Sequence, residues 1–129
     1  MENLFNKKFR FRNFQVYKDS REFGKKLKKL TRERFPKIEQ FCLLSQVWRA
    51  LDSIILNIAE GSDRGTDKDF AHFLNLSHTS LNEVVSCLDV SLDNNYISKE
   101  EHEVYLKEAA ILSDQLTAFR MKLIKNPTK

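Results

Sequence analysis

Apolar residues return every three or four positions in four long segments of this 129-residue chain, and this period constrains the fold most. The spacing places apolar side chains on one face of an α-helix. It predicts helices over about 14–34, 41–60, 67–93 and 99–124. Gly (3) and Pro (2) are scarce, which disfavours a loop-rich β-fold. We therefore expect an all-α, antiparallel up-down-up-down four-helix bundle, one domain over residues 1–129 with a basic and aromatic segment at 1–12.

Local signals mark the ends of these helices. Phe35-Pro36 ends the first, because the residue before proline is pushed out of the helical region. Gly61 is expected just past the second helix, in the left-handed conformation that glycine adopts freely. Thr66 and Ser98, each with an acid three residues on, are typical of capping boxes, and Asn94-Asn95 of a turn. The stretch from Asn57 to Asp67 thus reads as a corner; it lacks the spacing of a nucleotide-binding loop.

The second helix has more apolar surface than one bundle core needs. Its second stripe includes Leu43, Trp48 and Ile55, and we expect another copy of the chain to cover it. A polar row adjoins these stripes and faces polar residues of the third helix. Together they form a predicted polar seam, which fixes register and subunit pairing: Gln46, Arg49, Ser53, Asn57, Glu60, Ser80 and Glu83. Within it, an Arg49–Glu83 ion pair is expected.

Charge is distributed unevenly along the chain. The net charge is +4, yet residues 1–37 contain 13 Lys and Arg against 4 Asp and Glu. This asymmetry favours an acidic partner, either nucleic acid or another copy, although a solvated helix face is an alternative. The candidate nucleic-acid-binding residues lie on the first helix: Lys25, Lys26, Lys28, Lys29, Arg32 and Arg34.

The N-terminal segment alternates aromatic and cationic side chains, in Lys7-Lys8 and Phe9-Arg-Phe-Arg12. This pattern is typical of proteins that bind single-stranded nucleic acid. Alternatively, Phe11 and Phe14 only close the mouth of the bundle.

No residue pattern predicts catalysis, a metal site or a cofactor. The three histidines, His72, His78 and His102, match no metal-binding motif. The cysteines Cys42 and Cys87 are expected to be free, buried thiols in a reducing cytoplasm. Neither a secretory signal nor a membrane span is evident, so we expect a soluble cytoplasmic protein.

Several motifs taken together resemble the family of four helix bundle proteins first noticed in intervening sequences of 23S rRNA genes: Arg49-Ala50, Ser53-Ile54, Asn57 to Gly61, Arg64, Phe73-Leu74, and Ser80 with Glu83. The resemblance extends over roughly residues 9–124. It implies a bundle that assembles as a homopentamer, without an established enzymatic activity. It also implies kinship with the accessory variability protein of diversity-generating retroelements, and hence nucleic acid and a nucleic-acid-processing protein as partners.

Three hypotheses about function follow. The first is a non-catalytic homo-oligomeric bundle that binds RNA, or an RNA/DNA intermediate, through its basic first helix. The second is an assembly or adaptor bundle without nucleic-acid binding, whose basic helix meets acids on a neighbour's last helix: Glu100, Glu101, Glu103 and Glu108. The third is a hydrolase in which Glu60, with His72 or Arg64, acts as acid or base.

Overall fold

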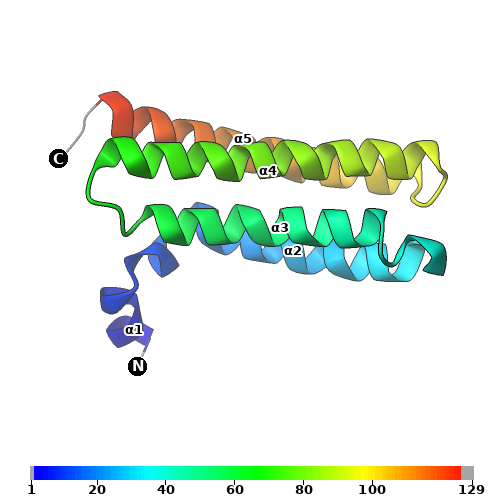
Figure 1. Ribbon diagram of the computed structural model, residues 1–129, viewed down its shortest axis with the longest axis horizontal. Coiled ribbons are helices and arrows are strands. Elements are labelled where there is room, and N and C mark those ends of the chain that lie inside the picture. Colours follow the sequence, from blue (N-terminus) through cyan, green and yellow to red (C-terminus); the bar gives the residue numbers. More distant parts are fainter. Residues whose placement is uncertain (1, 126–129) are drawn as a thin grey trace.

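The computed structural model describes residues 2–125 and consists of helices joined by short connections (Figure 1). The four long helices are α2 (Gln15–Arg34), α3 (Leu43–Gly61), α4 (Asp67–Asp93) and α5 (Lys99–Lys125). A short helix, α1 (Glu2–Lys8), and two 3₁₀ turns, η1 (Arg10–Asn13) and η2 (Lys37–Glu39), complete the order. The predicted all-α class is confirmed, while α1 was not expected from the sequence.

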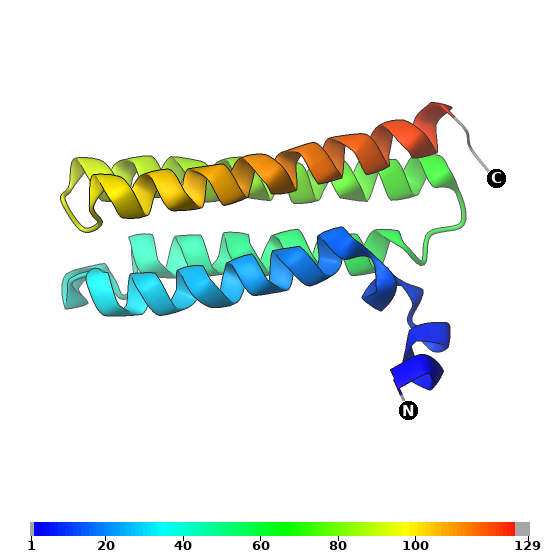
Figure 2. The ribbon, with the colours of Figure 1, turned by 180° about the vertical axis from the view of Figure 1, so that it is seen from behind.

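Consecutive long helices run antiparallel and lie side by side as a bundle (Figures 1 and 2). The pair α2 and α3 forms one layer, and the pair α4 and α5 forms the other. α1 projects sideways from the bundle, near the end at which α2 begins, and η1 is its only neighbouring element in the described part of the chain. We call the segment from α1 through η1 the arm.

The predicted apolar stripes meet in one core between the four long helices. Fully buried side chains come from every long helix and include Leu27, Ile58, Leu74 and Leu116. Burial of such side chains contributes about 1.5–3 kcal/mol each relative to leaving them in water. A buried hydrogen bond from Ser77 Oγ to the Ile54 carbonyl, 2.8 Å long, sets the level at which α3 and α4 face each other.

Aromatic rings close the end of the bundle from which the arm leaves. Phe70 lies at the centre, with ring centroids 6.0 Å from Phe14 and 5.1 Å from Phe119. The expectation that Phe14 closes the mouth is therefore confirmed. Phe11 instead lies against Tyr17, with a centroid distance of 5.0 Å, outside this cluster.

The prediction that Gly61 adopts a left-handed conformation just past the helix is wrong. The described residues include no glycine with positive φ, and Gly61 is the last residue of α3. Its role is close packing: a Cβ there would lie 2.6 Å from Phe73 Cβ and 3.0 Å from Phe70 Cδ1. The left-handed residue after a helix is Asn95, whose φ is 62°, in the expected turn after α4.

Part of the second apolar stripe of α3 is covered by α2 within the same chain. Trp48 Nε1 donates a 2.9 Å hydrogen bond to Oγ1 of the buried Thr31. Ile55 packs at Gly24, where a Cβ would be 3.7 Å from Ile55 Cδ1. Leu43 packs against the core. These three side chains are half-buried, so the expected contact with a second copy stays a prediction.

The start of α3 also differs from the prediction. The helix begins at Leu43, so Cys42 is exposed and only Cys87 is buried; both thiols are free. Glu39 explains the later start, since its Oε1 accepts a 3.2 Å hydrogen bond from the Leu43 amide. Its Oε2 accepts a 2.7 Å bond from the Tyr96 hydroxyl, and this hydrogen bond raises the pKa of Tyr96.

The capping box before α5 forms as predicted. The Glu101 amide donates to Ser98 Oγ, and the Ser98 amide donates to Glu101 Oε1, both at 3.0 Å. The Thr66 cap also forms, through a 3.1 Å bond from the Asp69 amide. The Ser98 amide first, and then the Arg34 side chain, lower the pKa of Glu101 below its usual 4.5.

We expect Glu101→Ala to lower the free energy of unfolding at pH 7 by about 1 kcal/mol through loss of this cap. A depressed folded-state pKa stabilises the fold above the unfolded-state pKa, and this contribution is lost as pH falls through the folded-state value. The difference between wild type and variant should therefore shrink below about pH 4.5 in urea titrations. Glu100→Ala, at an exposed site in the same turn, is the control. Equal losses for both variants would contradict the assignment.

Candidate functional site

A row of exposed cations follows one face of α2. Its members are spaced by 3, 4, 4 and 3 residues, so they share a stripe of the helix. The described residues include no ion pair from any member to a carboxylate, in contrast to other cations on α2. We call this row the basic stripe: Lys18, Arg21, Lys25, Lys29 and Arg32.

The other three predicted binding residues are paired within the chain. Lys26 Nζ lies 2.6 Å from Glu108, and Arg34 lies 2.9 Å from Glu101, both on α5. Lys28 Nζ lies 2.6 Å from Asp52 on α3. The hydrogen bond to Glu108 raises the pKa of Lys26. Three of the four glutamates that the adaptor hypothesis assigned to a neighbour are thus paired within their own chain, because Glu103 also lies 3.5 Å from Lys107 Nζ.

Three of the six predicted cations therefore lie on the basic stripe, together with two that were not predicted. Lys25, Lys29 and Arg32 belong to the basic stripe, while Lys18 and Arg21 were missed. Helical spacing alone was a sufficient signal for those two, because they continue the same series toward the N-terminus.

Aromatic faces lie under several of these cations. The Arg32 guanidinium is 5.0 Å and Lys28 Nζ is 5.5 Å from the Trp48 ring centroid. The Arg21 guanidinium is 5.7 Å from the ring of Tyr17. The contacts with Trp48 hold Arg32 and Lys28 over the α2–α3 face, and the contact with Tyr17 holds Arg21 along α2.

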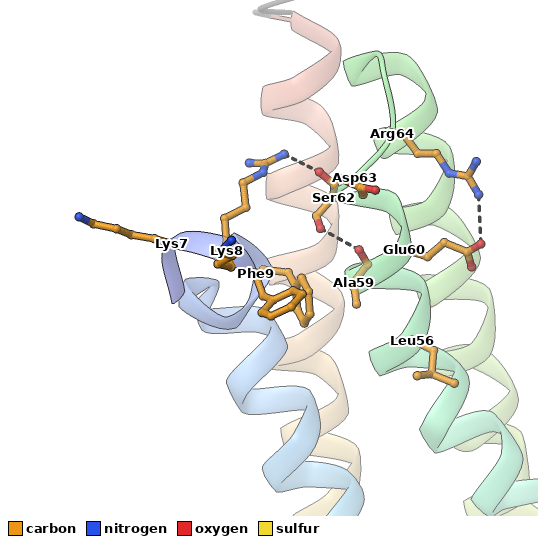
Figure 3. A pocket seen from close by; sticks show the side chains of 11 residues that line it. Lys7, Lys8, Phe9, Leu56, Ala59, Glu60, Ser62, Asp63 and Arg64 are labelled. Atoms are coloured by element: carbon orange, nitrogen blue, oxygen red, sulfur yellow. Dashed lines mark hydrogen bonds and ion pairs between the residues drawn. The ribbon is translucent and has the colours of Figure 1, made fainter. Parts of the chain in front are cut away.

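A second surface lies at the end of the bundle, where the arm faces the last turns of α3 (Figure 3). There, an open cleft of about 870 Å³ combines cationic, aromatic and aliphatic side chains. We call it the arm cleft. It is lined by Lys7, Lys8, Phe9, Arg10, Phe11, Leu56, Ala59, Glu60, Ser62, Asp63 and Arg64.

Arg10 anchors the arm to the bundle. Its Nη2 donates a 2.8 Å hydrogen bond to the carbonyl of Ser62, just after α3 (Figure 3). The guanidinium also lies 5.5 Å from the Phe14 centroid and 5.6 Å from that of Phe70. The corner between α3 and α4 thus holds the arm in place, a role that the sequence pattern did not indicate.

Glu60, the residue considered for hydrolysis, lines this cleft in an exposed position. Its Oε1 is 3.1 Å from Arg64 Nη2, and its side chain is 59% exposed. The Arg64 guanidinium in turn lies 4.3 Å from the centroid of Phe73. His72, the proposed partner, is exposed on α4 and does not line the cleft.

Only the middle of the predicted polar seam joins α3 to α4. Ser53 Oγ and Ser80 Oγ are 2.8 Å apart, and Asn57 Nδ2 donates to Ser53 Oγ at 3.0 Å. Gln46, Arg49 and Glu60 are exposed, and Glu83 is half-buried. The expected Arg49–Glu83 ion pair is absent among residues 2–125. The seam therefore consists of a hydroxyl and amide cluster with a solvated edge.

Within residues 2–125, no group of three or more His, Cys, Asp and Glu side chains could hold a metal ion. His78 shares a 2.8 Å hydrogen bond with Ser113, and His102 lies 2.8 Å from Asp89. None of the described helices is both long enough and apolar enough to cross a membrane.

Comparisons with known proteins agree with this architecture. A model of the family described as 23S rRNA-intervening sequence protein matches residues 12–118. The comparison with curated proteins gives no match. Among solved structures, the chain is similar to a protein of unknown function from the S23 ribosomal protein family of Bacteroides thetaiotaomicron. The TM-score is 0.75 at 24% identity, covering 82% of this chain and 95% of that chain, a likeness that shows the fold alone. Because the family match spans most of the sequence, this chain belongs to the 23S rRNA-intervening sequence protein family.

Proposed function

We propose that the protein is a non-catalytic, homo-oligomeric bundle of the cytoplasm that binds nucleic acid, RNA or an RNA/DNA intermediate, through the basic stripe. One observation supports this above all: five exposed cations share one face of α2, and the described residues give none of them a carboxylate partner. At 1.5 Å per residue, the stripe from Lys18 to Arg32 is about 21 Å long. Cations in such a row can contact successive phosphates of one strand and release their counterions.

Self-association is supported by apolar side chains exposed on α4. Leu76 is 36% and Val90 is 44% exposed. They are close to four helical turns apart, so they lie on one face of α4, about 21 Å from each other. An apolar face of this kind suits contact with a second copy. The pentamer is the stoichiometry that the family resemblance implies.

Neutralising three stripe residues should weaken binding. In the variant Lys25→Gln/Lys29→Gln/Arg32→Gln, we expect at least a tenfold loss of affinity for mixed-sequence RNA at about 0.1 M salt. The slope of log K against log salt should fall by about 0.7 for each lost phosphate contact with a single strand. Fluorescence anisotropy over a salt series measures both quantities.

The matched control is Lys68→Gln/Lys99→Gln/Lys122→Gln, which removes three exposed cations from α4 and α5. Both triple variants lower the net charge of +4 by the same amount. Equal losses would mean that only total charge matters, and the stripe would not be the site. If wild type does not bind RNA at low salt, the adaptor hypothesis replaces this one. Native mass spectrometry with and without RNA reports the subunit number in either case.

A further inference from the structure

The arm presents an aromatic ring that the described residues leave about half exposed. Phe9 is 52% exposed. Its centroid is 6.3 Å from that of Phe11 at an interplanar angle of 62°, so the two rings do not stack on each other. An exposed aromatic face costs free energy in water, and this one lines a cleft. The ring is therefore available to a flat ligand.

The opposite wall of the cleft is aliphatic. Leu56 and Ala59, from the last turns of α3, face the arm across the open space (Figure 3). The volume of about 870 Å³ lies within the range of about 300–1,000 Å³ that is usual for small-ligand sites. The cleft therefore offers a flat ring apolar surfaces on both walls, Phe9 on the arm and Leu56 on α3.

Charged side chains of opposite sign lie at the two sides of the cleft, which makes these sides chemically different. Arg10 is already bonded to Ser62, and Arg64 to Glu60. The remaining cations, Lys7 and Lys8, have no carboxylate partner in the described part of the chain, and they lie on the arm. The Asp63 carboxylate likewise has no ion pair among residues 2–125, and it lies on the corner after α3. Phosphate is thus favoured near the arm, and groups that donate hydrogen bonds are favoured near the corner.

We infer that the arm cleft binds an unpaired nucleotide of a single-stranded nucleic acid. The base stacks on Phe9 against Leu56, its phosphates lie near Lys7 and Lys8, and Asp63 accepts a hydrogen bond from an amino group of the base. A base within a duplex is stacked and paired, so it cannot enter. This inference rests on the proposed function and specifies its substrate class as single strands.

The geometry also connects the cleft to the basic stripe. Phe9, Phe11 and Tyr17 follow one another at centroid distances of 6.3 and 5.0 Å, and Arg21 lies over Tyr17. Aromatic rings and cations thus alternate from the cleft to the start of the stripe. Proteins that bind single strands without sequence preference combine these two elements.

The test compares Phe9→Ala with Phe5→Ala, an exposed aromatic of α1 that does not line the cleft. The probes are one labelled mixed-sequence RNA of about 20 nucleotides, as a single strand and as a duplex with its complement. Phe9→Ala should weaken single-strand binding about five- to hundredfold, the measured range for removing one stacking platform. Phe5→Ala should bind like wild type, and duplex binding should not change with Phe9→Ala.

A second measurement reports stacking directly. Phe9→Trp retains an aromatic face, so it should retain single-strand affinity, and its added fluorescence should be quenched by the single strand. The inference is overturned if wild type binds RNA but Phe9→Ala and Phe5→Ala behave alike, or if Phe9→Trp is not quenched. A cleft that serves an apolar peptide of a protein partner would give that result. Loss of binding in the stripe variant alone would then leave the proposed function intact, whereas an absence of any RNA binding would reject both.

Discussion

Gly61→Ala is expected to lower the free energy of unfolding by about 2–3 kcal/mol, within the range found for overpacked sites. The added Cβ would lie 2.6 Å from Phe73 Cβ, an atom fixed by the α4 backbone that cannot rotate away. α3 and α4 must therefore move apart. The higher helix propensity of alanine offsets at most about 1 kcal/mol of this loss. Urea unfolding monitored by circular dichroism measures the net loss.

Gly65→Ala is the matched control for this variant. Gly65 has no heavy atom within 4 Å of the position a Cβ would occupy, and its φ is not positive. An alanine there should leave the free energy of unfolding unchanged or raise it by about 0.5 kcal/mol at most, because alanine lowers the conformational entropy of the unfolded chain. If both variants were equally stable, the close packing of α3 on α4 at Gly61 would be in error.

Phe70→Ala should have a larger effect, a loss of about 3–5 kcal/mol. Phe70 is 3% exposed, and its ring contacts Phe14, Phe119 and the guanidinium of Arg10. Truncation leaves a cavity at the end of the bundle and removes part of the support of the arm. For a chain of this length the melting temperature should fall by about 10–20 °C. Thermal unfolding measures the shift.

The arm offers a second readout for Phe70→Ala, because Arg10 loses one of its two aromatic contacts. Limited proteolysis should then cleave near Arg10 and Arg12 faster than in wild type, at temperatures where the bundle stays folded. Phe41→Ala, at a side chain that is 86% exposed, is the control and should change stability by no more than about 0.5 kcal/mol. A Phe70→Ala protein as stable as Phe41→Ala would contradict the aromatic closure.

Much of the fold could be predicted because each long helix has its own local pattern. The stripe of α5, for example, includes Ala109, Leu112 and Leu116, all of which are buried. Capping at Ser98 and the turn at Asn95 also depend on residues a few positions apart, so the sequence shows them directly. The short α1 escaped prediction, since seven residues give a helical period too few repeats to be recognised.

The candidate site was predicted less well, because pairing depends on neighbours that are distant in sequence. Lys25 and Lys26 are adjacent in the chain, yet only Lys26 reaches an α5 carboxylate, that of Glu108. Likewise, the apolar excess of α3 indicated a covering surface but not its identity. Trp48 and Ile55 proved to lie against α2.

The sequence by itself determined the all-α class, the approximate bounds of the four long helices and the basic character of the first, because these follow from local period and composition. Only the tertiary structure decided which cations on α2 remain unpaired and that Gly61 is a packing contact. It also decided that Arg10 and Ser62 hold the arm over the end of α3. The physical reason is that distances between helices arise from how side chains of all four helices pack together, and no single segment encodes them.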